Sequence, residues 1–120
     1  MIHEMKLRPQ PFSAIRRGEK TFELRLYDEK RQMIRVGDTL RFTETESGER
    51  LAAEVVALHR FPTFAALYSA LPLTRCGYTE DQLATASPED MRAYYTKEEE
   101  EKYGVVAIEI KVLPQSHPKA

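Results

Sequence analysis

The segment from Gly18 to Leu26 constrains the fold most, because a glycine turn there runs directly into an alternating stretch. Successive side chains of a strand point to opposite faces, so the alternation predicts a strand over about 20–27 with one apolar and one charged face. The apolar positions are Phe22, Leu24 and Leu26, and the polar ones are Thr21, Glu23 and Arg25. Glu23 and Arg25 then lie on one face, roughly 7 Å apart.

The charges of this strand allow two interpretations. Lys20 enters from the turn, so the face that it joins stays open. Two cations around the Glu23 carboxylate on a rigid strand suit an anionic or hydrogen-bonding ligand such as a nucleotide. The simpler hypothesis is a surface ion pair on an amphipathic strand, which contributes little to stability.

Alternating apolar residues and turns predict four further strands. His3, Met5 and Leu7 indicate a short N-terminal strand, and a helix with Phe12 and Ile15 follows. Gly18 ends that helix in the position that a left-handed cap prefers. A turn at 36–38 leads to a strand with Leu40 and Phe42, a hairpin turn at 46–49 leads to a strand over about 50–61, and the last strand carries inward residues: Val106, Ile108, Ile110 and Val112.

Helices are expected between the fourth and the last strand. Thr63 is the expected cap of a helix that Pro72 stops, and Thr79 and Thr96 each begin a capping-box pattern. The acidic run at 98–101 suits the positive end of a helix dipole better than a metal, because consecutive helical residues point in different directions. Tyr94 and Tyr95 form a pair from which one ring is able to stack on a base while the other packs inside, although packing in the core is the simpler role.

Composition limits the class of protein. The 120 residues support one domain, which we place at 1–114, with a disordered tail at 115–120. The single cysteine, Cys76, forms no internal disulfide and has no zinc-type spacing, and neither a signal peptide nor a long apolar segment is present. We therefore expect a cytoplasmic monomer without a metal, a cofactor or a membrane partner.

The distribution of charge is uneven. The net charge is −1, which argues against a protein that coats nucleic acid. Residues 1–42 hold 10 Lys and Arg against 6 Asp and Glu, whereas residues 43–120 hold 8 against 13. This asymmetry either creates a local basic surface or is blurred when the two halves fold into one body.

Several motifs together resemble one known family. They are Leu7-Arg8-Pro9, Pro11-Phe12, Gly18-x-Lys20-Thr21-x-Glu23-x-Arg25, Val36-Gly37-Asp38, Gly77-Tyr78-Thr79, Tyr94-Tyr95 and the run from Tyr103 to Ile110. The chain resembles the ASCH domain, which is related to the PUA RNA-binding fold and has G-x-K-x-x-E-x-R as its hallmark. The resemblance implies an α+β fold: a small, partly open PUA-like β-barrel of about five strands with helices packed around it.

The resemblance also implies a site and a function. The expected ligand is RNA or a nucleotide, bound in a cleft by Lys20, Thr21, Glu23 and Arg25, with Arg17 as a further candidate. Two alternatives remain: an enzyme on RNA or a modified nucleoside, amidohydrolase- or nuclease-like, and a protein-interaction domain in transcription or translation control.

The enzyme alternative meets two departures from the related amidohydrolase branch, which removes the acetyl group of N4-acetylcytidine. Lys20 matches that branch's lysine, but Glu23 stands where its threonine nucleophile is expected. Its glutamate is also missing, since 73–76 here reads Leu-Thr-Arg-Cys. Lys20 and Arg25 would lower the pKa of Glu23 and leave an ion pair, so Lys20 and Glu23 are catalytic candidates only if the protein is an enzyme. Thr21 could replace the threonine only in a different strand register.

Overall fold

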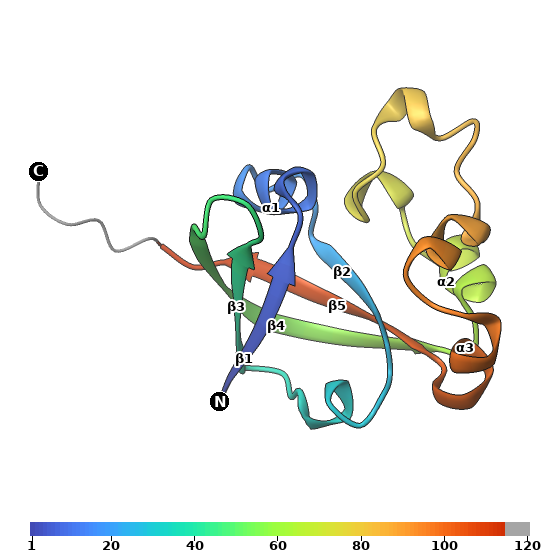
Figure 1. The fold of residues 1–120 in the computed structure, drawn as a ribbon, viewed down its shortest axis with the longest axis horizontal. Helices are drawn as coiled ribbons and strands as arrows, with labels where there is room; N and C mark the ends of the chain where they lie inside the picture. Colours follow the sequence, from blue (N-terminus) through green and yellow to red (C-terminus); the bar gives the residue numbers. More distant parts are fainter. Residues whose placement is uncertain (115–120) are drawn as a thin grey trace, which may run out of the picture.

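The computed structural model describes residues 1–114, so the predicted tail at 115–120 lies outside the described residues. Five strands form one mixed sheet in the order β1-β3-β4-β5-β2. Their bounds are β1 Ile2–Leu7, β2 Phe22–Leu26, β3 Thr39–Glu44, β4 Arg50–Phe61 and β5 Val105–Val112. Only the β1–β3 pair is parallel, and the sheet curls into the half-barrel visible in Figure 1. The predicted α+β fold with a partly open barrel is confirmed.

The helices lie around this sheet. The α-helices in the described part of the chain are α1 Pro9–Arg16, α2 Phe64–Ala70 and α3 Lys97–Tyr103, and short 3₁₀ helices occupy η1 Arg31–Met33, η2 Leu73–Arg75, η3 Glu80–Gln82 and η4 Pro88–Ala93. Residues 62–104 form what we call the helical cover, which lies beside the barrel in Figure 1. No helix within residues 1–114 is long and apolar enough to cross a membrane.

The barrel interior forms one hydrophobic core. Its largest buried side chains come from α1, β3, β4 and β5: Phe12, Ile15, Leu40, Phe42, Leu51, Val55, Val106 and Ile108. The alternation predicted for β3 and for the last strand is therefore correct, since these residues face inward from every second position. A β-bulge between Val55 and Ala57 bends the long strand β4, so it serves both the barrel and the cover.

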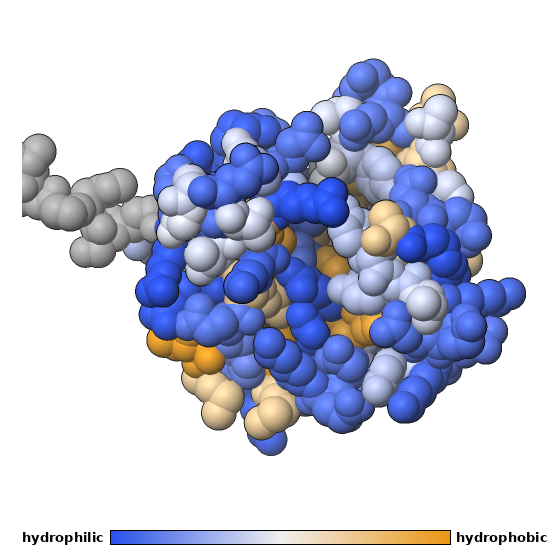
Figure 2. Space-filling model, in the orientation of Figure 1, coloured by the Kyte–Doolittle hydropathy of each residue, from blue (hydrophilic) through white to orange (hydrophobic). Residues whose placement is uncertain are grey.

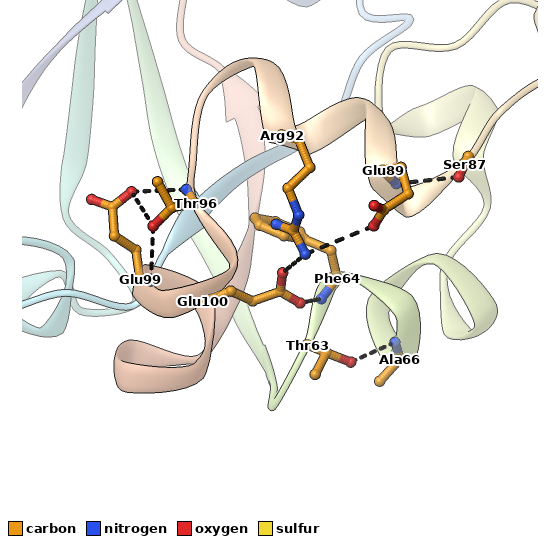
Figure 3. A network of polar contacts seen from close by, with 9 residues as sticks. All are labelled: Thr63, Phe64, Ala66, Ser87, Glu89, Arg92, Thr96, Glu99 and Glu100. Atoms are coloured by element: carbon orange, nitrogen blue, oxygen red, sulfur yellow. Dashed lines mark hydrogen bonds and ion pairs between the residues drawn. The ribbon is translucent and has the colours of Figure 1, made fainter.

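A second core lies on the outer face of β2 and β5. Phe22, Leu24 and Leu26 pack there against the helical cover, together with Phe64, Leu67, Cys76, Met91, Val105 and Ala107. The expected cap of α2 is present, because Thr63 Oγ1 accepts a hydrogen bond from Ala66 N at 3.1 Å. Thr96 caps α3 in the same way through Glu99 N (Figure 3).

The acidic run at 98–101 has a structural role that the sequence did not indicate. Glu100 is 5% exposed and accepts hydrogen bonds from Phe64 N at 2.7 Å and from Arg92 Nη2 at 2.6 Å. Figure 3 shows how this carboxylate joins α3 to the start of α2 and to η4. The run therefore begins a helix, as predicted, and one of its members also holds the helical cover together.

Candidate functional site

The three charged residues of the hallmark motif meet on one face of β2. Lys20 Nζ lies 3.0 Å from Glu23 Oε1, and Arg25 Nε donates to Glu23 Oε2 at 2.6 Å. Glu23 and Arg25 stand opposite Ile108 and Val106 of β5, which both belong to the barrel core. The structure thus places Lys20 on the same side as Glu23, which the sequence left open.

The simpler hypothesis of a surface ion pair is wrong, because Glu23 is only 3% exposed. The side chains of Lys20 and Arg25 are 11% and 15% exposed, so the two cations cover the carboxylate and present their outer atoms to solvent. Glu23 also stands opposite Ile108 of the barrel core, so its own strand pairing turns it away from solvent. We call the space above Lys20, Glu23 and Arg25 the cation cleft.

The two walls of the cation cleft come from the barrel and from the helical cover. On the barrel side, Arg25 Nη2 donates to the Lys6 carbonyl at 3.3 Å, which links the two edge strands β2 and β1. On the cover side, the Tyr95 phenol interacts with Arg25. The aliphatic stem of Lys20 runs past Gly77, whose φ of +111° is one that residues with a Cβ rarely adopt.

The space-filling view shows a hollow in the surface near this cluster. Figure 2 shows a hollow between the barrel and the helical cover, over the region where Figure 1 places β2. Apolar and hydrophilic surface both appear inside the hollow, and hydrophilic surface forms much of its rim. A cleft of this kind excludes part of the water around a ligand, which strengthens contacts between charges.

The electrostatics of the cluster favour its charged form. Burial alone would raise the pKa of Glu23, but the neighbouring Lys20 and Arg25 outweigh it and hold that pKa below its usual range. For Arg25, burial would lower the pKa, while Glu23 and the Tyr95 hydroxyl raise it. One carboxylate and two cations leave the cleft with a net charge of +1, and Glu23 Oε1 accepts no well-directed hydrogen bond.

Two predicted site residues lie apart from this cluster. The backbone of Thr21 is occupied, because its N–H donates to the Arg75 carbonyl at 2.9 Å and its carbonyl accepts from Ile110 N at 2.9 Å. Thr21 lines a separate pocket of about 450 Å³ with Arg75, Glu109 and Lys111. The strand register therefore does not bring Thr21 to the nucleophile position. Arg17 is exposed, and its Nε and Nη2 donate to the Glu19 carboxylate at 3.0 and 2.9 Å. It is not a partner of Lys20, Glu23 and Arg25, which we call the triad.

Other candidate groups have structural partners. His59, for which the sequence indicated no partner, lies 2.9 Å from Glu109 across the β4–β5 pair. Burial raises the pKa of the Cys76 thiol to about 11, although Lys20 acts to lower it, so the thiol stays protonated at neutral pH. Within residues 1–114, no group of His, Cys, Asp and Glu is arranged to hold a metal ion.

Three residues that contact the cluster lie outside the segment from Gly18 to Arg25. Gly77 and Tyr95 belong to two of the other motifs that the family resemblance rests on, and no role in the site was predicted for Gly77. Lys6 contributes its backbone carbonyl, which every residue type carries, so no sequence pattern could indicate it.

Another pocket, of about 370 Å³, is lined by none of the triad residues. Its lining residues are Tyr27, Arg60, Phe61, Pro62, Tyr103, Gly104 and Val105.

Comparisons with known proteins agree with this fold. The hypothetical protein PH0355 shares 33% identity with this chain over 94% of it and 100% of PH0355, with a TM-score of 0.78. Protein PF0455 from Pyrococcus furiosus shares 34% identity, covering 96% of this chain and 100% of its own, with a TM-score of 0.71. No curated protein matches the sequence significantly.

A more distant structure carries the family name. ASCH from Zymomonas mobilis has 16% identity, covers 92% of this chain and 66% of its own, and has a TM-score of 0.64, which supports the fold alone. The sequence profile of the ASCH domain matches residues 5–114, which include all five motif positions from Gly18 to Arg25 and both walls of the cleft. This chain therefore belongs to the ASCH domain family.

Proposed function

We propose that this protein binds RNA or a nucleotide in the cation cleft. The observation that carries the proposal is the buried Glu23 carboxylate, which holds Lys20 and Arg25 side by side while only the two cations reach solvent. A net positive, partly dry cleft suits a phosphate and a hydrogen-bonding base edge. The RNA-binding fold to which the family is related supports the same ligand class.

The burial of Glu23 divides the roles within the triad. Glu23 Oε1 has almost no exposed surface, so a ligand meets Lys20 and Arg25 first, and Glu23 acts as a positioning residue. Lys20 supplies a point charge for phosphate, and Arg25 offers the remaining donors of its planar guanidinium. The same burial argues against Glu23 as a nucleophile, because it stays paired with two cations.

The test is a titration of the purified protein with nucleosides, nucleoside monophosphates and short single-stranded RNAs, at two salt concentrations. We expect phosphate-bearing ligands to bind more tightly than nucleosides, with an affinity that falls as salt rises. Arg25→Lys keeps the charge and loses the planar fork, so it should weaken binding by about 1–3 kcal/mol.

The matched control is Arg41→Lys. Arg41 of β3 also pairs with a carboxylate, that of Glu4 directly opposite it on β1, but this pair is exposed. Equal effects of Arg25→Lys and Arg41→Lys would contradict a specific cleft. Multiple-turnover release of cytidine from N4-acetylcytidine, abolished by Lys20→Ala, would instead favour the enzyme alternative.

A further inference from the structure

One contact joins the barrel side of the cation cleft to its cover side. The guanidinium carbon of Arg8 lies 5.6 Å from the centroid of the Tyr94 ring. Arg8 is exposed and directly precedes α1 on the barrel side, whereas Tyr94 follows η4 in the helical cover and is 57% exposed. The two side chains therefore meet from opposite walls.

Their positions relative to the triad follow from neighbouring contacts. Lys6, two residues before Arg8, receives the hydrogen bond from Arg25, and Tyr95, next to Tyr94, interacts with the same guanidinium. The rings of Tyr94 and Tyr95 are 6.4 Å apart. Arg8 and Tyr94 therefore come from the same two segments whose other members, Lys6 and Tyr95, contact Arg25.

The tyrosine pair is divided between two environments. Tyr95 stacks on Phe64 with ring centroids 5.9 Å apart and an interplanar angle of 15°, so it is part of the core of the helical cover. Tyr94 stays outside, and its hydroxyl makes no hydrogen bond to any residue in the described range 1–114. The packed ring fixes the backbone that presents the exposed ring, which lowers the entropy lost when a ligand stacks on it.

We propose that Arg8 and Tyr94 form a clamp that takes one unpaired nucleobase between the guanidinium and the phenol ring. The base enters between the two side chains while its sugar-phosphate reaches Lys20 and Arg25 below. This inference rests on the proposed function and narrows it to a ligand that offers a single unstacked base, either a free nucleotide or a base of single-stranded RNA.

The geometry requires only a small opening. Atoms in van der Waals contact are about 3.5 Å apart, so a base sandwiched between two flat groups needs about 7 Å between them. The present separation of 5.6 Å must therefore grow by about 1.5 Å. Exposed side chains reorient on the picosecond to nanosecond timescale, so this opening is fast. No carboxylate among residues 1–114 lies within ion-pair distance of Arg8, so no ion pair has to break when the side chain moves.

The chemistry of both faces suits a base. An arginine guanidinium and an aromatic ring each stack on the π-face of any nucleobase, and such stacking tolerates different sequences. The present Arg8–Tyr94 contact covers these two faces when no ligand is bound. A phosphate alone would engage Lys20 and Arg25 but would gain nothing from the clamp.

The experiment compares adenosine 5′-monophosphate, ribose 5-phosphate and a short oligo(A) on the wild-type protein and four variants. Tyr94→Ala and Arg8→Ala should each weaken binding of the nucleotide, or of oligo(A), roughly tenfold or more. Tyr94→Phe keeps the ring and should stay close to wild type. Arg16→Ala is the matched control, because Arg16 is an exposed arginine over the Phe12 ring of α1, away from the clamp.

Ribose 5-phosphate separates the two proposals, because it lacks the base. We expect it to bind weakly and equally to all variants. If the wild type binds it as tightly as the nucleotide, or if Tyr94→Ala leaves nucleotide and oligo(A) binding unchanged, the clamp is overturned and the phosphate-binding cleft survives. If none of the three ligands binds, both proposals fail together.

The fold control is simple because both clamp residues are exposed. Urea melts of Tyr94→Ala and Arg8→Ala should match the wild type closely. The chain has no tryptophan and six tyrosines, so quenching of tyrosine fluorescence in the wild type, reduced in Tyr94→Ala, reports stacking on this ring directly. A nucleotide that binds without quenching would contradict the clamp.

Discussion

Glu23 and Glu100 are both buried carboxylates, and the comparison between them separates the proposed binding site from a structural joint. They are 3% and 5% exposed. Glu100 accepts one hydrogen bond from the Phe64 backbone and one from Arg92, so its charge is matched and its two oxygens are used (Figure 3). Glu23 contacts two cations and no backbone N–H.

The difference lies in what remains after each carboxylate has been paired. The Glu100 contacts join three helical segments, and Arg92, which also lies 3.8 Å from Glu89, leaves no positive charge in excess, which suits a role in the fold. The Glu23 contacts leave one positive charge in excess beside a cleft, which serves no evident need of the fold and is typical of a site for an anion. Burial of a carboxylate therefore does not by itself indicate a binding site. An excess of positive charge among its partners is the feature that distinguishes Glu23 from Glu100.

The largest expected effect is the loss of Glu23. Glu23→Ala leaves Lys20 and Arg25 largely buried without a counter-charge, so the free energy of unfolding should fall by about 3–5 kcal/mol in urea melts at pH 7. Glu4→Ala removes the carboxylate of an exposed pair with Arg41 and should cost about 0–1 kcal/mol. Similar small losses in both variants would show that the Glu23 pair behaves as a surface pair.

The apolar neighbour of Glu23 gives the next test. Ile108 stands opposite Glu23 in the β2–β5 register and is fully buried in the barrel core. Ile108→Ala should cost about 2–5 kcal/mol, because it leaves a cavity. Lys111→Ala, exposed on the same strand, should cost little. Equal, small losses in the two variants would contradict the inward face assigned to β5.

Removal of the Glu100 charge should have a smaller effect, confined to stability. Glu100→Gln keeps an acceptor for Phe64 N but loses the charged contact with Arg92, so it should cost about 1–3 kcal/mol. Glu101→Gln, exposed in the same helix, is the control. Ligand titration should give the wild-type affinity in both variants. Weakened binding in Glu100→Gln would contradict a purely structural role for Glu100.

The smallest expected effect is a change in pH dependence. The pKa of Glu23 is lower in the folded state than in the unfolded chain, so its stabilising contribution is full above the ordinary carboxyl range and is lost as the pH falls through the folded pKa. The stability gap between wild type and Glu23→Gln should therefore narrow below about pH 4.5. Urea melts at a series of acidic pH values measure it, and a gap that widens toward acid would reverse the sign.

Local pattern was enough to predict the strands and the pairing of the motif charges. The alternation from Phe22 to Leu26 is a property of neighbouring residues, and it correctly placed Glu23 and Arg25 on one face. The capping patterns at Thr63 and Thr96 predicted helix starts for the same reason. The half-barrel itself came from the family resemblance, since strand order depends on contacts that no local pattern records.

Long-range packing explains what the pattern did not predict. Glu23 is buried because it pairs with the barrel-core strand β5 and is covered by Lys20 and Arg25, and the local pattern does not record which neighbours a strand receives. The His59–Glu109 contact depends on the β4–β5 register, and the Glu100 bond depends on where α2 begins. Thr21 shared the motif with Lys20 but turned to another pocket, because the strand pairing at its backbone sets its direction.

Strand β5 carries both hydrophobic cores on its two faces, and this has a consequence for cooperativity. Val106, Ile108 and Ile110 point into the barrel, while Val105 and Ala107 point to the helical cover. If the helical cover detached, it would expose the Val105 and Ala107 face of β5, whose other face is part of the barrel core. We therefore expect the barrel and the cover to unfold in one cooperative transition. The amides of β5 should then exchange with solvent only through global unfolding, and the two layers should melt as one unit.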